Sequence, residues 1–289
     1  MFDFRYHALT LVAVFMALVI GLLLGVAVGD EGLVSGAERR LRSDLRADVE
    51  AARTASRDLQ SQLDVRERYE DQTYEAVVGD RLTGRRVAVL TLHQSSPATF
   101  DAVREAILPA GGEVSFVGRL RLPPDLDALA GASGGTRFED LEDDPALLGA
   151  FGTRFGQQLA TGGPSLDDVR RQLFASSSGE LEGVEAVVVI RTAAGGRSPE
   201  EAERELDFVE GLVDGLRDFE TPLAGVERTD TEPSQIDWYR DRGIPSVDNV
   251  DQIAGRAALV LVLAGGGDGA YGIKSTAEAL LPETLLSSP

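Results

Sequence analysis

The sequence contains no cysteine, a single lysine and only two histidines. Without cysteine the chain has no disulfide bonds, no thiolate metal site and no cysteine nucleophile. Acidic residues outnumber basic ones by 48 to 28, which gives a formal net charge of −20 at pH 7. Because a nucleic-acid-binding surface needs clustered lysine and arginine, this charge balance argues against nucleic acid as a partner.

Signals of catalysis are also sparse. His93 is the only histidine beyond the first seven residues. The one G-x-S-x-G match, GASGG at residues 131–135, lies in a predicted loop and not in a strand-to-helix nucleophile elbow. Ser95 and Ser96 are close to His93 in sequence, but their pattern is typical of a helix cap. We therefore expect no catalytic residue, no cofactor and no enzyme, while a nucleotide-binding or hydrolytic α/β enzyme stays open as an alternative.

One long apolar run covers residues 8–28 and contains no charged side chain. As a helix it would extend for roughly 30 Å, about the thickness of a bilayer's hydrocarbon core. A cleaved signal peptide is the competing interpretation, because Ala27-Val28-Gly29 resembles a small-x-small cleavage site. The run is longer than a secretory apolar region, so we favour an uncleaved signal anchor over residues 1–31.

Small residues recur every fourth position within this run. Two helices can approach closely along such a stripe, which predicts a homodimer in the membrane. The stripe consists of Ala13, Ala17, Gly21, Gly25 and Gly29.

The charges beside the span do not settle its orientation. Arg5 precedes it, whereas four arginines lie between residues 39 and 46, which by the positive-inside rule would favour a cytoplasmic C-terminal side. Against this, the head before the span is short and Asp30 and Glu31 follow directly.

Residues 32–83 have a helix-forming composition with few breakers. A heptad pattern predicts a coiled-coil stalk, although a solvated amphipathic helix lying on its own domain would share the pattern. The apolar seam consists of Leu45, Val49, Ala52, Ser56, Leu59 and Leu63.

From residue 84 onward, short apolar runs alternate with helical patterns. This order predicts a three-layer α/β domain over residues 84–289, with a mostly parallel sheet. We expect Ser96 and Ser198 to cap helices. The predicted strands are 86–92, 113–122, 185–191, 222–227, 244–247 and a central strand at 257–264. The predicted helices are 97–110, 145–160, 166–176, 199–219 and 235–242.

Two segments near the C-terminus are candidates for a binding loop. Residues 267–272 match G-x-G-x-x-G after a predicted strand, with Gly269, Tyr271 and Gly272 in the motif, which on a dinucleotide-binding fold would hold a pyrophosphate. No acidic residue follows at the spacing for a ribose, so a tight glycine turn is the simpler interpretation.

The second segment supplies oxygen ligands. Asp248, Asn249 and Asp251 could bind a hard cation, or they could cap the turn that follows. The cation-loop consensus is missing, so we assign no metal site.

The two ends of the chain resemble a known family. The start, MFDFRYHALTLVAVFMALVIGLLLG, and the segments SVDNVDQIAGR (246–256) and AYGIKS (270–275) resemble the actinobacterial MctB-like copper transport proteins, whose relatives include SteB-type cell-separation proteins. The resemblance implies an envelope protein with its folded part outside the cytoplasm and a role in copper homeostasis. Its SteB-type branch implies a scaffold that regulates a peptidoglycan hydrolase through a membrane partner.

The residues fit direct copper carriage poorly. Cu(I) prefers thiolate or thioether ligands and Cu(II) prefers imidazole, yet beyond residue 16 the sequence has no cysteine, no methionine and one histidine. The sequence therefore predicts a single-pass, dimeric cell-membrane protein whose extracytoplasmic domain acts by binding an unidentified envelope or membrane protein.

Overall fold

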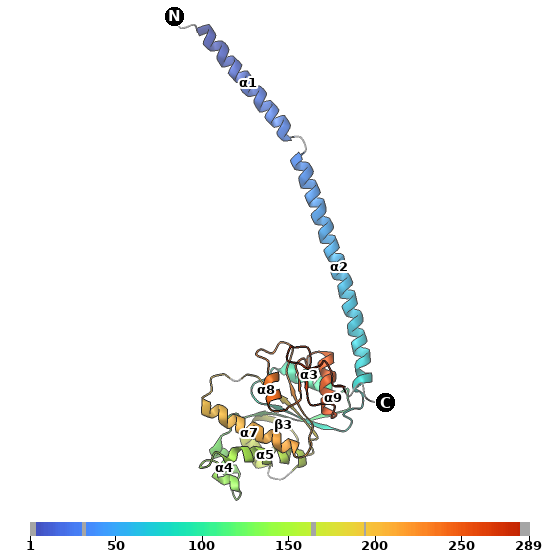
Figure 1. Cartoon of the computed structure of the whole chain (residues 1–289), viewed down its shortest axis with the longest axis vertical. Coiled ribbons are helices and arrows are strands. Elements are labelled where there is room, and N and C mark those ends of the chain that lie inside the picture. The colour runs from blue at the N-terminus through green and yellow to red at the C-terminus, as the bar shows by residue number, and fades with distance from the viewer. Residues whose placement is uncertain (1–3, 31–32, 163–165, 194, 284–289) are drawn as a thin grey trace. The chain divides into compact units, whose positions relative to one another are not determined.

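The computed structural model describes residues 4–30, 33–162, 166–193 and 195–283 (Figure 1). Its contacts divide the chain into two compact units, one ending at Glu67 and the other beginning at Arg68. The elements in chain order are α1 (Phe4–Asp30), α2 (Leu33–Val78), β1 (Arg86–Thr91), α3 (Pro97–Ile107), β2 (Glu113–Leu120), α4 (Leu126–Ala132), η1 (Arg137–Asp140), α5 (Leu147–Thr161), α6 (Leu166–Leu173), β3 (Phe174–Gly179), β4 (Ala186–Ile190), α7 (Pro199–Arg217), β5 (Leu223–Val226), α8 (Ile236–Asp241), β6 (Ser246–Val247), α9 (Ile253–Leu263) and β7 (Ala270–Tyr271).

The first unit holds α1 and most of α2. Within α1, Tyr6–Ala27 is long and apolar enough to cross a membrane, and none of it is buried against other parts of the chain. The helix α2 runs for 46 residues without a break. Its apolar seam is exposed, because Leu45, Val49, Leu59 and Leu63 are each between 49% and 60% accessible.

The second unit, which we call the head, is a mixed α/β structure around a seven-stranded sheet. The strand order is β3-β2-β1-β4-β5-β6-β7, and every neighbouring pair is parallel except β2 with β3. The last turns of α2 belong to this unit: Val78 is fully buried, and the Tyr74 hydroxyl donates to the Ala106 carbonyl at 3.3 Å. The predicted mostly parallel sheet is confirmed.

Alternate residues of the central strands contribute to two separate hydrophobic clusters. Ala88 and Leu90 of β1 belong to one cluster, and Val87 and Val89 belong to the other. Since successive side chains of a strand point to opposite faces, the two clusters lie on opposite sides of the sheet. Helices α5 and α7 supply the first cluster, and α3 and α9 supply the second (Figure 1).

Glycines allow α5 and α7 to pack backbone against backbone. A Cβ at Gly152 or Gly156 of α5 would overlap backbone atoms of α7, and a Cβ at Gly211 or Gly215 of α7 would overlap backbone atoms of α5. The small-residue spacing that allows close helix contact in membranes therefore also occurs inside this head.

Ser96 and Ser198 cap their helices as predicted. The Ser96 hydroxyl accepts from the Ala98 amide at the start of α3. Ser198 and Glu201 form a reciprocal capping box at the start of α7, with Pro199 at the first helical position.

Two element predictions were wrong, and some short elements, among them α4 and β3, were not predicted. Residues 257–264, predicted as a central strand, form most of α9. All of Ala257–Leu263 is buried, and the helix packs against β5, β6 and the neighbouring helix α3. Burial on all sides removes the polar stripe that marks a helix in sequence. The helix predicted over 166–176 ends at Leu173, where the edge strand β3 begins, and the two-residue β7 was missed.

Candidate functional site

Polar side chains gather at the carboxyl ends of the parallel strands β1 and β4. From β1 the chain goes to β2 on one side, and the next parallel strand, β4, lies on the other side of β1. Sheets of this type bind ligands where the strand order switches. The loops after β1 and β4 meet there: the Leu92 amide donates to the Ile190 carbonyl at 2.9 Å, and the Thr192 hydroxyl donates to the Gln94 carbonyl at 2.7 Å.

A triad of the buried Glu205 and the partly buried His93 and Arg197 joins these loops to α7. His93 Nε2 lies 3.0 Å from Glu205 Oε1, and Arg197 Nη2 lies 3.0 Å from His93 Nδ1. Arg197 Nη1 also pairs with the other oxygen of Glu205. These partners assign a neutral imidazole that donates from Nε2 and accepts at Nδ1. Burial, Arg197 and Arg191 accordingly lower the pKa of His93 to about 4.

The triad is satisfied internally, which limits its chemistry. Both ring nitrogens of His93 are engaged, so the imidazole is not positioned to accept a proton from a serine. Ser95 directs its hydroxyl to the Ser96 carbonyl at 3.5 Å, and Ser96 caps α3. The arrangement therefore fixes the loop after β1 and is not that of a nucleophile with its base.

Two arginines stack on the single tryptophan beside the triad. The guanidinium carbons of Arg191 and Arg242 lie 4.6 Å and 4.3 Å from the Trp238 ring centroid. Arg191 also donates to Gln235, and its backbone amide donates to the Tyr239 hydroxyl at 2.9 Å. Burial lowers the pKa of both guanidiniums and raises that of the Tyr239 phenol. The sequence did not indicate this cluster because its members lie after β4 and in or beside α8, which are far apart in the chain.

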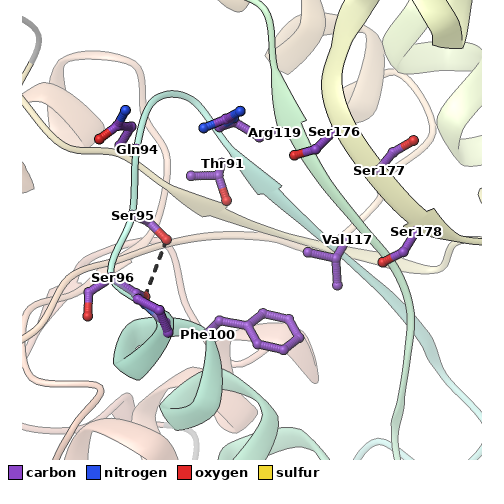
Figure 2. Close-up of a pocket in the computed structure, with 11 residues that line it drawn as sticks. Thr91, Gln94, Ser95, Ser96, Phe100, Val117, Arg119, Ser176, Ser177 and Ser178 are labelled. Atoms are coloured by element: carbon purple, nitrogen blue, oxygen red, sulfur yellow. Dashed lines mark hydrogen bonds between the residues drawn. The ribbon is translucent and has the colours of Figure 1, made fainter.

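An open trough of about 640 Å³ lies beside the switch point, between β1–β3 and the start of α3 (Figure 2). The strand register places Thr91, Arg119 and Ser176 in one row across β1, β2 and β3. The lining residues are mostly hydroxyl-bearing: Thr91, Gln94, Ser95, Ser96, Pro97, Phe100, Val117, Arg119, Ser176, Ser177 and Ser178. Sequence analysis missed the trough because it did not predict β3.

The predicted oxygen ligands lie at the opposite end of the sheet. Asp248 is fully buried, and its two carboxylate oxygens accept from the Ile273 and Lys274 amides, each at 2.8 Å. Asp251 accepts from the Thr229 amide at 2.7 Å and from the Thr229 hydroxyl at 3.1 Å. Asp248 and Asp251 therefore accept hydrogen bonds from loops that are distant in sequence, and these bonds are not the Asx cap of the following turn that the sequence suggested. Asn249, also fully buried, has its amide nitrogen 3.5 Å from Gln252 Oε1.

The G-x-G-x-x-G segment lies beside these carboxylates. It follows α9 and contains β7, so the expectation that it follows a strand was wrong. A Cβ at Gly272, whose φ is +140°, would overlap the Asp248 carboxylate. The Tyr271 hydroxyl accepts from the Gly269 amide at 3.4 Å. The glycines thus let this loop pack closely onto β6.

The only lysine of the chain completes this end of the sheet. Lys274 Nζ lies 2.6 Å from Glu227 Oε1 and donates to the Thr231 carbonyl at 3.0 Å. The Glu227 carboxylate is buried and also accepts from the Ser234 hydroxyl at 2.7 Å. We call Glu227, Asp248 and Lys274, with their partners, the C-terminal clamp. Sequence analysis did not single out Lys274 as functional, although its rarity was a signal.

The predicted small-residue stripe lies within α1. Ala13, Ala17, Gly21 and Gly25 are exposed, and a Cβ at Gly21 or Gly25 would meet no described atom within 4 Å. Gly29 is also in the helix. Pairing along the stripe stays a prediction, as does pairing along the α2 seam.

A protein-family model described as "Copper transport outer membrane protein, MctB" matches residues 1–134 and 147–282. The chain belongs to the MctB family. The match includes the membrane-length helix, the long helix α2, the trough and the C-terminal clamp, so the MctB family resemblance seen at the two ends extends over the head. No curated protein matches the chain.

The MctB family model leaves out only a short internal segment and the chain's last residues. The internal gap, residues 135–146, contains η1. Among the described residues, no group of three or more His, Asp or Glu side chains is placed to hold a metal ion. The family description names copper, and the described side chains of this MctB family member bring together no copper ligand set.

Proposed function

We propose that this protein is an extracytoplasmic, membrane-anchored dimer that serves copper homeostasis by binding an envelope or membrane protein. It acts neither by catalysis nor by carrying the metal on its own side chains. The family membership supports the copper and envelope assignments. The observation that carries the dimer is the long, exposed seam of α2.

The seam gives a physical reason for pairing. Four large apolar side chains, Leu45, Val49, Leu59 and Leu63, are exposed at heptad spacing on one helix. Burying an apolar side chain of this size contributes about 1.5–3 kcal/mol. A second copy presents the same seam in register, and the α1 stripe would hold the two copies close together in the membrane.

The chemistry of the head supports an indirect role in copper handling. His93, the one imidazole outside the membrane-length helix, uses both ring nitrogens within the triad. Asp248 uses both oxygens on backbone amides. These groups would have to break internal hydrogen bonds before they could ligate copper.

The dimer is tested by measuring the mass of the full chain in detergent by sedimentation. We expect the wild type to sediment as a dimer. In the Leu59→Glu, Leu63→Glu double variant, the dissociation constant of the dimer should rise at least about tenfold. Ser61→Glu, Thr54→Glu on the outer face of the same heptads is the matched control and should remain dimeric. A wild type that stays monomeric at high concentration would remove the stalk from the proposal.

The indirect role in copper handling is tested by metal content. The purified full chain is incubated with Cu(I) or Cu(II), desalted and analysed for copper. We expect no stoichiometric retention of either ion. One tightly held copper per chain would show direct carriage and contradict the proposed mode of action.

Partner binding is tested by crosslinking in membranes of the native host. We expect the wild type to crosslink to one membrane or envelope protein at a fixed ratio, and a variant lacking residues 68–289 to lose it. If the anchor and stalk alone retain that protein, the head is not the binding part.

A further inference from the structure

The trough differs in charge from the rest of this acidic chain. The sequence carries a formal charge of −20, yet among the described residues that line the trough there is no aspartate or glutamate and one arginine, Arg119. No hydrogen bond or ion pair joins the Arg119 side chain to another described residue. A cation without an internal partner, in a chain rich in carboxylates, is available to an external anion.

The remaining lining groups are suited to hydroxyls. Ser176 and Ser178 lie across from Arg119 and Val117 in the β2–β3 register, so these four side chains share one face of the sheet. Ser95 and Ser96 line the other side of the trough, with Gln94 at its end (Figure 2). Each serine hydroxyl can both donate and accept, as the hydroxyls of a sugar can.

The trough also offers an apolar surface. Phe100 extends from α3 beside Val117, and both side chains are half-buried (Figure 2). A ring face combined with a few convergent polar groups is the usual composition of a small-molecule site. A saccharide has matching parts, because the C–H face of its ring is apolar and its rim is hydroxylated.

The loop that forms one wall is held in place before any ligand binds. The His93–Arg197–Glu205 triad fixes its start, Thr192 holds the Gln94 carbonyl, and Ser96 caps α3 at its end. A site whose supporting groups are already bonded loses little conformational entropy on binding.

We propose that the trough binds an acidic saccharide, a polyhydroxylated ligand with one carboxylate or phosphate group. The anionic group pairs with Arg119, the ring hydroxyls bond to the serines and Gln94, and the C–H face of the ring packs on Phe100. This site is separate from the membrane pairing and from any copper chemistry.

The test is saturation-transfer NMR on the full chain in a detergent with neither a sugar nor a phosphate head group. The probes are glucuronate, glucose 6-phosphate, methyl glucoside and acetate. We expect saturable binding of at least one acidic sugar, with methyl glucoside and acetate each bound at least about tenfold more weakly. The two acidic probes distinguish a carboxylate ligand from a phosphate ligand.

Three variants locate the site. Arg119→Gln should weaken acidic-sugar binding at least about tenfold and leave methyl glucoside unchanged. Ser178→Trp, which fills the trough from an exposed strand position, should remove binding of all sugars. Arg104→Gln, which replaces an exposed arginine that does not line the trough, should bind as the wild type does, and the thermal midpoints of all variants should match.

Several results would overturn the proposal. They are no saturable binding of either acidic sugar, acetate binding as tightly as glucuronate, or unchanged binding in Arg119→Gln or Ser178→Trp. These binding measurements do not depend on dimer formation or on copper. Failure to bind a saccharide would therefore not contradict the proposed function, and a monomeric chain would not contradict the saccharide site.

Discussion

The two ends of the sheet use polar residues in opposite ways. At the β7 end, Asp248 and Glu227 are buried, and the carboxylates are paired with backbone amides and with Lys274. At the β3 end, Ser176 and Ser178 are exposed and Arg119 faces solvent. Buried polar groups must find hydrogen-bond partners within the chain, whereas exposed polar groups are hydrated by water that a ligand can replace. The contrast separates residues that stabilise this head from residues available for binding.

The largest effect is expected from the buried ion pair. Lys274→Met leaves Glu227 buried without its cation and should lower the free energy of unfolding by about 3–5 kcal/mol. Urea denaturation measures this loss. Arg240→Met, which removes a cation from the exposed pair with Asp237, is the matched control and should cost at most about 1 kcal/mol.

Adding Glu227→Gln to Lys274→Met tests the cause. The double variant no longer buries an unpaired charge, so it should recover part of the lost stability. If the double variant is no more stable than Lys274→Met, the loss comes from packing, and the comparison between the two ends of the sheet is weakened.

A smaller loss of stability is expected from removing the Asp248 carboxylate of the C-terminal clamp. Asp248→Ala removes the acceptor of two buried amide bonds and should cost about 3 kcal/mol, measured in the same way. Asp268→Ala, in an exposed part of the loop before β7, should change stability by less than about 0.5 kcal/mol. Equal losses of stability in the two variants would contradict the stabilising role assigned to Asp248 in the C-terminal clamp.

The triad at the centre of the sheet predicts a pH dependence. The pKa of His93 is about 4 in the folded protein against 6.5 in an unfolded chain. Between these values the unfolded state binds a proton that the folded state does not, so the contribution of His93 to stability is full above pH 6.5 and falls as pH drops toward 4. The difference in unfolding free energy between wild type and His93→Gln should therefore shrink from pH 7 to pH 4.5.

Carboxylates that do not contact His93 affect both proteins alike, so the difference reports on the imidazole together with its partner Glu205. A difference that stays constant over this range would mean that the folded and unfolded proteins bind protons at His93 equally, so that folding does not lower its pKa. That result would contradict the imidazole assigned to the triad, which stays neutral in the folded protein at pH values where the unfolded chain binds a proton.

The smallest effect is expected at the β3 end. Ser176→Ala and Ser178→Ala should each change the unfolding free energy by less than about 0.5 kcal/mol, because the hydroxyls are exposed. Thermal unfolding checks this. A loss above 1 kcal/mol at either position would show that the trough residues serve the fold, as the clamp residues do.

Local chemistry explains what could be predicted for the head. The apolar runs of β1 and β4 and the caps at Ser96 and Ser198 depend on residues close together in sequence. The candidate site depends on distant residues. His93 meets Glu205 across more than a hundred positions, and Arg119 and Ser176 share a face only because β3 pairs with β2.

By itself, the sequence determined that the first helix is long and apolar enough to span a membrane, that a long helix with an apolar seam follows, and that an acidic α/β head comes after it. These features repeat with a local period, so a window of neighbouring residues is enough to read them. Tertiary structure alone decided that residues 257–264 are a buried helix, that Asp248 holds the backbone near Lys274, and that a trough opens beside β3. The reason is that burial and strand pairing depend on which distant segments come into contact, and the spacing of residues within a local window does not show these contacts.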